Sequence, residues 1–80
     1  MIEITPGIIV TPQIRFGRPV ISGARVPVAT VIARIASGVS FTEVMEEYEI
    51  TREDIFNALN YAAVRLAEEQ IWLTANSLAS

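Results

Sequence analysis

The sequence contains no cysteine, no histidine and no lysine. Without cysteine there is no disulfide framework and no thiolate chemistry. Without histidine the chain lacks the usual general base, the commonest zinc ligand and every catalytic triad that includes histidine. A pair of carboxylates would still suffice for acid–base chemistry, but most of the acids lie around two expected helix starts, where acids cap helices and face solvent. The glycines form neither GxxxxGK[ST] nor GxGxxG. We therefore expect no enzyme, no metal site and no cofactor.

Long apolar runs are also missing. A membrane span needs about 18 to 20 apolar residues, and Arg34 and Arg65 interrupt the two best candidates. The amino end, MIEITPG, has no charged segment followed by an apolar one, so it does not have the pattern of a signal peptide. We expect a cytoplasmic protein that does not enter a membrane.

Apolar residues are nevertheless abundant. They make up 51% of the 80 residues, and the mean hydropathy is +0.41. We expect residues 1–80 to form a single domain, near the size at which one core is only marginally stabilising. A globule this small has too much surface to bury so many apolar side chains. Some of that surface should be shared with another chain, which predicts a homodimer or a larger homo-oligomer.

Charge is distributed unevenly along the chain. Residues 1–40 contain four arginines and one acid, a net charge of +3, whereas residues 41–80 contain two arginines and eight acids, a net charge of −6. Every cation is an arginine, whose planar fork suits bidentate binding of carboxylates or phosphates. Such polarity can orient a partner or a second copy, although four arginines over forty residues is also an ordinary surface composition.

Residues 1–27 have the features of a short β hairpin or meander. Two β-branched runs, at 2–4 and 8–10, are separated by a Thr-Pro-Gly turn. Ser22-Gly23 lies between apolar residues, which predicts a tight turn with Gly23 at positive φ. Pro27 suits the first turn of a following helix, where its missing N–H is not needed.

Three helices are expected over residues 28–71, which gives an α+β fold that is mainly α. The first helix has apolar residues at helical spacing and ends at Gly38. Ser40 and Glu43 have the spacing of a capping box at the start of the second helix, and Thr51 caps the third. The uncharged tail, residues 72–80, either extends the third helix or forms an apolar arm. The third helix has a broad apolar band that consists of Ile55, Phe56, Leu59, Ala62, Ala63, Leu66, Ala67 and Ile71.

The second helix (41–48) and the third, from residue 52 onward, are joined by three residues, the dimensions of a helix-turn-helix. Arg52, Asn57 and Asn60 are the candidate nucleic-acid contacts, since asparagine can pair with adenine in the major groove. The two acids that follow Arg52 would face phosphates, and a pI near 4.7 opposes DNA binding. Two interpretations stay open: a DNA-binding unit, or the same two helices used only for packing.

The stretch GRPVISGARVPV (17–28), the helix that ends at Gly38 and the stretch SFTEVMEEYEITREDIFNALNYAA together resemble the bacterial and archaeal family known as domain of unknown function 433. The resemblance covers about residues 4–67 and is most specific at Gly23-x-Arg25-x-Pro27-Val28. Ala24 stands where the family commonly has threonine. The resemblance implies a β N-terminal portion, a helix-turn-helix-like domain, and a role as antitoxin-like partner of a PIN-like ribonuclease toxin.

Gly23, Arg25 and Pro27 form the motif that we single out within this resemblance. Gly23 and Pro27 are expected to shape a tight turn that holds Arg25 in a set direction. Two roles for Arg25 stay open. It either bonds an acid of the second or third helix, or it contacts a partner chain such as the acidic metal site of a PIN-like nuclease.

Three functions are weighed. The first is a non-enzymatic antitoxin-type binding protein that forms a homo-oligomer, neutralises a PIN-like ribonuclease and regulates its own operon. The second is a helix-turn-helix transcriptional regulator without a toxin partner. The third is a pure oligomerisation module. The acidic pI predicts that any binding of DNA by the isolated protein is weak.

Overall fold

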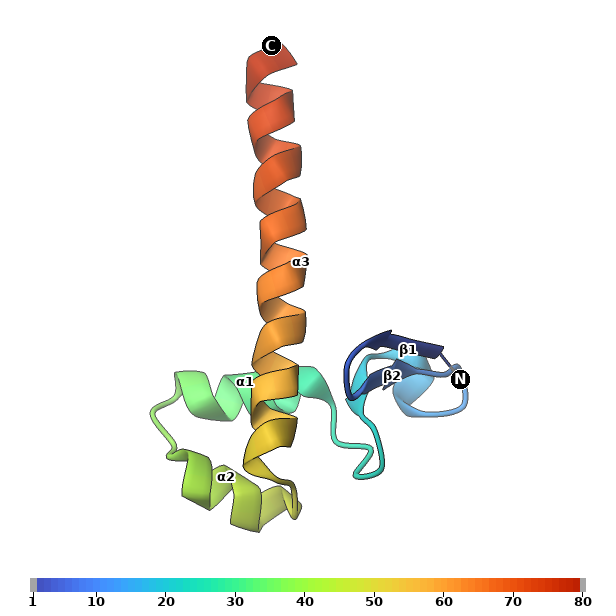
Figure 1. The fold of residues 1–80 in the computed structure, drawn as a ribbon, viewed down its shortest axis with the longest axis vertical. Coiled ribbons are helices and arrows are strands. Elements are labelled where there is room, and N and C mark those ends of the chain that lie inside the picture. The colour runs from blue at the N-terminus through green and yellow to red at the C-terminus, as the bar shows by residue number, and fades with distance from the viewer. Residues whose placement is uncertain (1, 80) are drawn as a thin grey trace.

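A three-stranded sheet followed by three helices forms the fold in the computed structural model, which describes residues 2–79 and the side chains of residues 2–69 (Figure 1). Strands β1 (Ile2–Thr5), β2 (Ile8–Val10) and β3 (Val20–Ile21) are antiparallel and adjacent in chain order. The helices are α1 (Val28–Ala36), α2 (Phe41–Tyr48) and α3 (Arg52–Ala79). The expected α+β fold, mainly α, is confirmed.

Strands β2 and β3 contribute buried residues to the core, whereas β1 is exposed. Ile8 of β2 and Ile21 of β3 are fully buried and are register partners. Strand β1 pairs with β2, and Ile2 and Ile4 on it are exposed. Gly7 makes the turn between β1 and β2 with φ +76°. Within the described residues β1 is therefore an edge strand.

Local signals set the ends of α1 and α2. Helix α1 begins at Val28, the expected start of the helical region. Pro27 is its N-cap, with extended backbone (φ −60°, ψ 135°), and so lies just before the first turn in which it was expected. Gly38 has φ +91° and ends α1 as expected. At the start of α2 the Glu43 N–H donates to Ser40 Oγ over 3.1 Å. The predicted cap of α2 is confirmed.

The start of α3 has the reciprocal form of a capping box. The Asp54 N–H donates to Thr51 Oγ1 at 3.0 Å, and the Thr51 N–H donates to Asp54 Oδ2 at 2.9 Å. Both interactions satisfy amides that a helix start leaves without a partner. Thr51 is thus confirmed as the cap of α3.

One apolar core joins the sheet to all three helices. It excludes water from the inner faces of β2, β3, α1, α2 and the first two turns of α3. This shared burial is the main stabilising contribution to the fold. The buried members are Ile8, Ile21, Val28, Val31, Val44, Ile50, Ile55 and Ala58.

Helix α3 continues far beyond this core. It runs to Ala79, so residues 72–79 extend the helix, which is one of the two alternatives that the sequence left open for the tail. Every side chain from Ala63 to Glu69 is exposed, and Figure 1 shows this part of α3 standing clear of the sheet, α1 and α2. Ile71 of the expected apolar band lies outside the residues whose side chains are described. Among residues 2–79, the helices lack the combination of length and apolar character that a membrane crossing requires.

Candidate binding site

A strained turn between β2 and β3 presents an aromatic ring to solvent. Arg15 (φ 53°), Phe16 (φ 57°) and Gly17 (φ 80°) are consecutive left-handed residues. Each non-glycine residue in that conformation costs about 1–2 kcal/mol. Backbone hydrogen bonds hold the turn, because the Gly17 and Arg18 amides donate to the carbonyls three residues before them at 3.1 Å. The Phe16 side chain is 98% exposed as a result. Strain that presents a side chain in this way is typical of binding sites.

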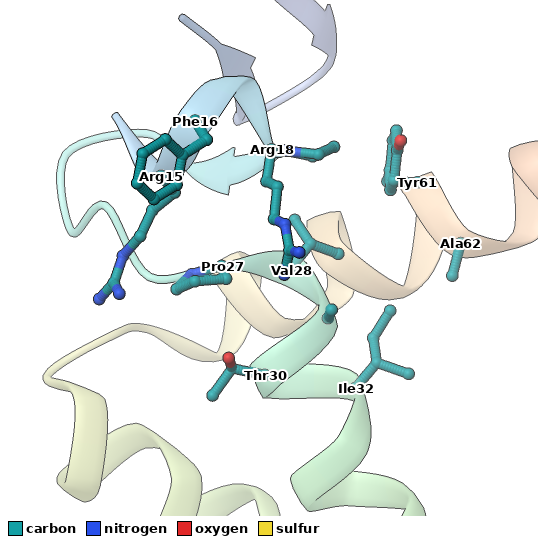
Figure 2. Close-up of a pocket in the computed structure, with 11 residues that line it drawn as sticks. Arg15, Phe16, Arg18, Pro27, Val28, Thr30, Ile32, Tyr61 and Ala62 are labelled. Carbon is teal, nitrogen blue, oxygen red and sulfur yellow. The ribbon is translucent and has the colours of Figure 1, made fainter. Parts of the chain in front are cut away.

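A pocket of about 740 Å³ lies beside this turn, where the loop meets the start of α1 and the middle of α3. In Figure 2, Arg18 extends from the loop over the start of α1, and Tyr61 lies across from it on α3. The remaining wall is mainly apolar. The lining residues are Arg15, Phe16, Arg18, Pro19, Pro27, Val28, Ala29, Thr30, Ile32, Tyr61 and Ala62.

The pocket is cationic, because it is lined by two arginines and by no acid. In residues 2–69 the ion pairs are Arg34–Glu47 at 2.9 Å and Arg65–Glu68 at 3.1 Å, and neither involves Arg15 or Arg18. Two guanidinium groups that form no ion pair among the described side chains lie beside an apolar wall, which suits a carboxylate or phosphate attached to an apolar group. Sequence analysis missed this site. The one sequence signal for it is Phe16, an isolated aromatic residue between Arg15 and a glycine.

The Gly23–Arg25–Pro27 motif forms a compact turn. Gly23 has φ +85°, as predicted, and Arg25 has φ +59°, which was not predicted. The Arg25 N–H donates to the Ile21 carbonyl over 2.8 Å, and an isolated bridge joins Val20 to Pro27. The motif therefore shapes the backbone between β3 and α1, and Pro27 at its end lines the pocket.

The Arg25 side chain itself is exposed. Within residues 2–69 it forms no hydrogen bond and no ion pair, so the expected bond to an acid of the second or third helix is absent from that part of the chain. A contact of Arg25 with a partner chain stays a prediction.

The helix-turn-helix-like unit places Arg52 on an aromatic cluster. Its guanidinium lies 5.2 Å from the ring centroid of Phe41 and 5.3 Å from that of Phe56. The two rings meet edge to face, with centroids 5.7 Å apart. Cation–π contacts of this kind fix the arginine against α2. The helical spacing of the two phenylalanines predicted their place near a helix face, but not their contact with Arg52.

The structure does not bring the three candidate DNA contacts together. Asn57 is half-buried against the β1–β2 turn, because a Cβ built on Gly7 would lie 2.5 Å from Asn57 Nδ2. Asn60 is exposed, and Arg52 is exposed but stacked on its two rings. Asn57 therefore supports the sheet rather than extending a free recognition face.

Comparison with known proteins gives one family. Residues 8–62 match the family model described as protein of unknown function (DUF433), which spans β2, β3, the motif, the pocket and the start of α3 but not β1. This match confirms the resemblance that residues 17–28, the helix ending at Gly38 and residues 40–63 indicated, with bounds somewhat shorter than the expected coverage of about residues 4–67. No curated protein and no solved structure matches the chain.

Proposed function

We propose that this chain, which belongs to the DUF433 family of proteins of unknown function, is a non-enzymatic binding protein of the antitoxin type. Its partner is a PIN-like ribonuclease. The observation that supports this most is the surface around the pocket, where the exposed Phe16 ring lies beside Arg15 and Arg18. Aromatic residues and arginine are the side chains that dominate binding energy at protein interfaces.

The chemistry of this surface indicates what the partner must offer. Two guanidinium groups without acidic partners in residues 2–69 favour carboxylates on the partner. The apolar wall formed by Pro27, Val28 and Ile32 favours an apolar side chain next to those carboxylates. A nuclease with an acidic metal site has such carboxylates. Binding there would compete with the metal and block activity.

The test uses purified full-length chain and the small nuclease encoded beside it. Phe16→Ala and Arg18→Ala should each weaken binding by about tenfold or more, measured by calorimetry. Arg65→Ala is the matched control, since Arg65 is an exposed arginine on α3 whose pair with Glu68 has little energetic value. All three variants should melt like the wild type, because none of the three side chains is buried. A wild type that does not bind the nuclease, or three variants that weaken binding equally, would contradict the proposal.

DNA binding is the second candidate, and the exposure of Arg52 and Asn60 at the start of α3 favours it. Glu53 and Asp54 lie in the same first turn and would repel phosphates. We therefore propose that operator binding occurs mainly in complex with the partner, where charges from more than one chain combine.

We further propose that the protein acts in the cytoplasm as a homo-oligomer. Exposed large apolar residues on three separate elements support the assembly, namely Ile2 and Ile4 on β1, Phe16 in the loop, and Phe56, Val64 and Leu66 on α3. Such side chains are normally covered by another chain when they gather on one face.

A further inference from the structure

We propose that two copies of this chain pair along one face of α3, formed by Phe56, Leu59, Ala63 and Leu66, which we call the α3 stripe. This proposal rests on the proposed homo-oligomer, and it identifies the surface through which two copies associate. The occupant of the stripe is a second α3.

The spacing of the stripe favours a helix as its partner. Its members follow one another at intervals of three, four and three residues. This alternation averages 3.5 residues and is the pattern by which one helix packs against another of the same pattern. A stripe with this repeat is complementary to itself, so a second copy provides a matching surface.

Among residues 2–69 the stripe is only partly covered by its own chain. Phe56 contacts Phe41 and the Arg52 guanidinium but is still 50% exposed, and Leu59 touches the core. Ala63 is exposed and Leu66 is 60% exposed, so the end of the stripe farther from the core is uncovered. Beyond Ala62 the described side chains of α3 contact solvent on every side, and Figure 1 shows no other element beside that part of the helix. Most helical stability in proteins comes from packing of an apolar face. A projecting helix with an exposed apolar face therefore has a physical reason to pair.

Charge does not oppose this pairing, although the second half of the chain has a net charge of −6. Arg52 precedes Phe56 by four positions on the same side of α3, where its guanidinium is held over the Phe41 and Phe56 rings. Between Phe56 and Ala67 the one charged residue is Arg65. It follows Ala63 by two positions, which places it about 200° round the helix, on the side away from the stripe. The flanking positions are Asn60, Ala62 and Ala67, which are uncharged and mostly small, so two helices can approach closely.

Strand β1 is the competing surface. Its outer edge is free within the described residues, and Ile2 and Ile4 are exposed on it. Edge strands of this kind also pair with other chains. A test must therefore separate pairing through α3 from pairing through β1.

The test is sedimentation equilibrium of the full chain at micromolar concentration. The wild type should be a dimer or larger. Leu66→Glu should weaken self-association by about 30-fold or more, because it places a charge on the exposed end of the stripe. Arg65→Glu is the matched control, since it adds a glutamate at the neighbouring position, about 100° round the helix from Leu66 and outside the stripe, and it should leave the assembly unchanged. Ile4→Glu on β1 should also leave it unchanged.

Circular dichroism checks that each variant is folded. All three replaced side chains are exposed, so the core should stay intact. If Leu66→Glu associates like the wild type, or if Ile4→Glu alone dissociates the protein, the α3 stripe is not the interface, while the proposed homo-oligomer still holds. A wild type that stays monomeric refutes both the α3 stripe and the proposed homo-oligomer. The proposed binding of a nuclease is tested separately, by the calorimetry of the Phe16 and Arg18 variants.

Discussion

Replacing Gly7 by alanine should destabilise the protein for two separable reasons. Gly7 has φ +76°, a conformation that costs a residue with a Cβ about 1–2 kcal/mol. The new Cβ would also lie 2.5 Å from Nδ2 of Asn57, so that group must shift, and 3.1 Å from Cγ, a tight contact. The Asn57 side chain is half-buried and must move, which adds about 1 kcal/mol, the low end for overpacking.

The expected total is about 2–3 kcal/mol. For a domain of this length each kcal/mol lowers Tm by about 4–8 °C, so Gly7→Ala should melt roughly 10–20 °C below the wild type. The matched control is Gly23→Ala, because Gly23 has φ +85° but no atom within 4 Å of its added Cβ. That variant should show the conformational cost alone.

A double-mutant cycle, measured by urea denaturation, isolates the energy of the contact between the Cβ added at position 7 and Asn57. In the Gly7→Ala background, Asn57→Ala should recover the steric part, giving a coupling energy of about 1 kcal/mol. Equal losses for Gly7→Ala and Gly23→Ala, with no coupling to Asn57, would refute the packing of Asn57 against the β1–β2 turn. Asn57 would then be available for base contacts, and the DNA-binding function would gain support.

The remaining predictions concern Arg25, the cap of α3 and DNA binding. Arg25→Ala should change the free energy of unfolding by less than about 0.5 kcal/mol, because the side chain has no polar contact within residues 2–69; a larger loss in urea denaturation would show that Arg25 is a structural anchor. Thr51→Ala should cost about 1 kcal/mol, because the Asp54 N–H loses its acceptor at 3.0 Å, and an unchanged urea midpoint would contradict the capping box. The isolated wild type should bind random duplex DNA poorly at physiological salt, since its net charge is −3; tight binding in a gel-shift titration would favour a transcriptional regulator.

The sequence by itself determined the order of the elements and most of their ends. Gly38, Ser40 and Thr51 act through backbone groups a few residues away, so a short stretch of sequence is enough to predict the helix ends that they set. The positive φ of Gly23 was predictable for the same reason. The absence of cysteine and histidine likewise excluded disulfides, thiolate chemistry and catalytic triads that include histidine on the basis of composition alone.

Tertiary structure alone decided which distant residues meet. The sequence does not place Arg18 and Tyr61 on the walls of one pocket, Gly7 against Asn57, or the Arg52 guanidinium over the Phe41 ring, because these arrangements depend on how the chain returns on itself. Helical spacing indicated that α3 has a broad apolar band. It did not show where the core stops covering that band, because burial depends on the lengths and directions of α1, α2 and the sheet. The exposed part of α3 and the pocket beside Phe16 are therefore properties of the packing, and the helix and turn boundaries are properties of the local sequence.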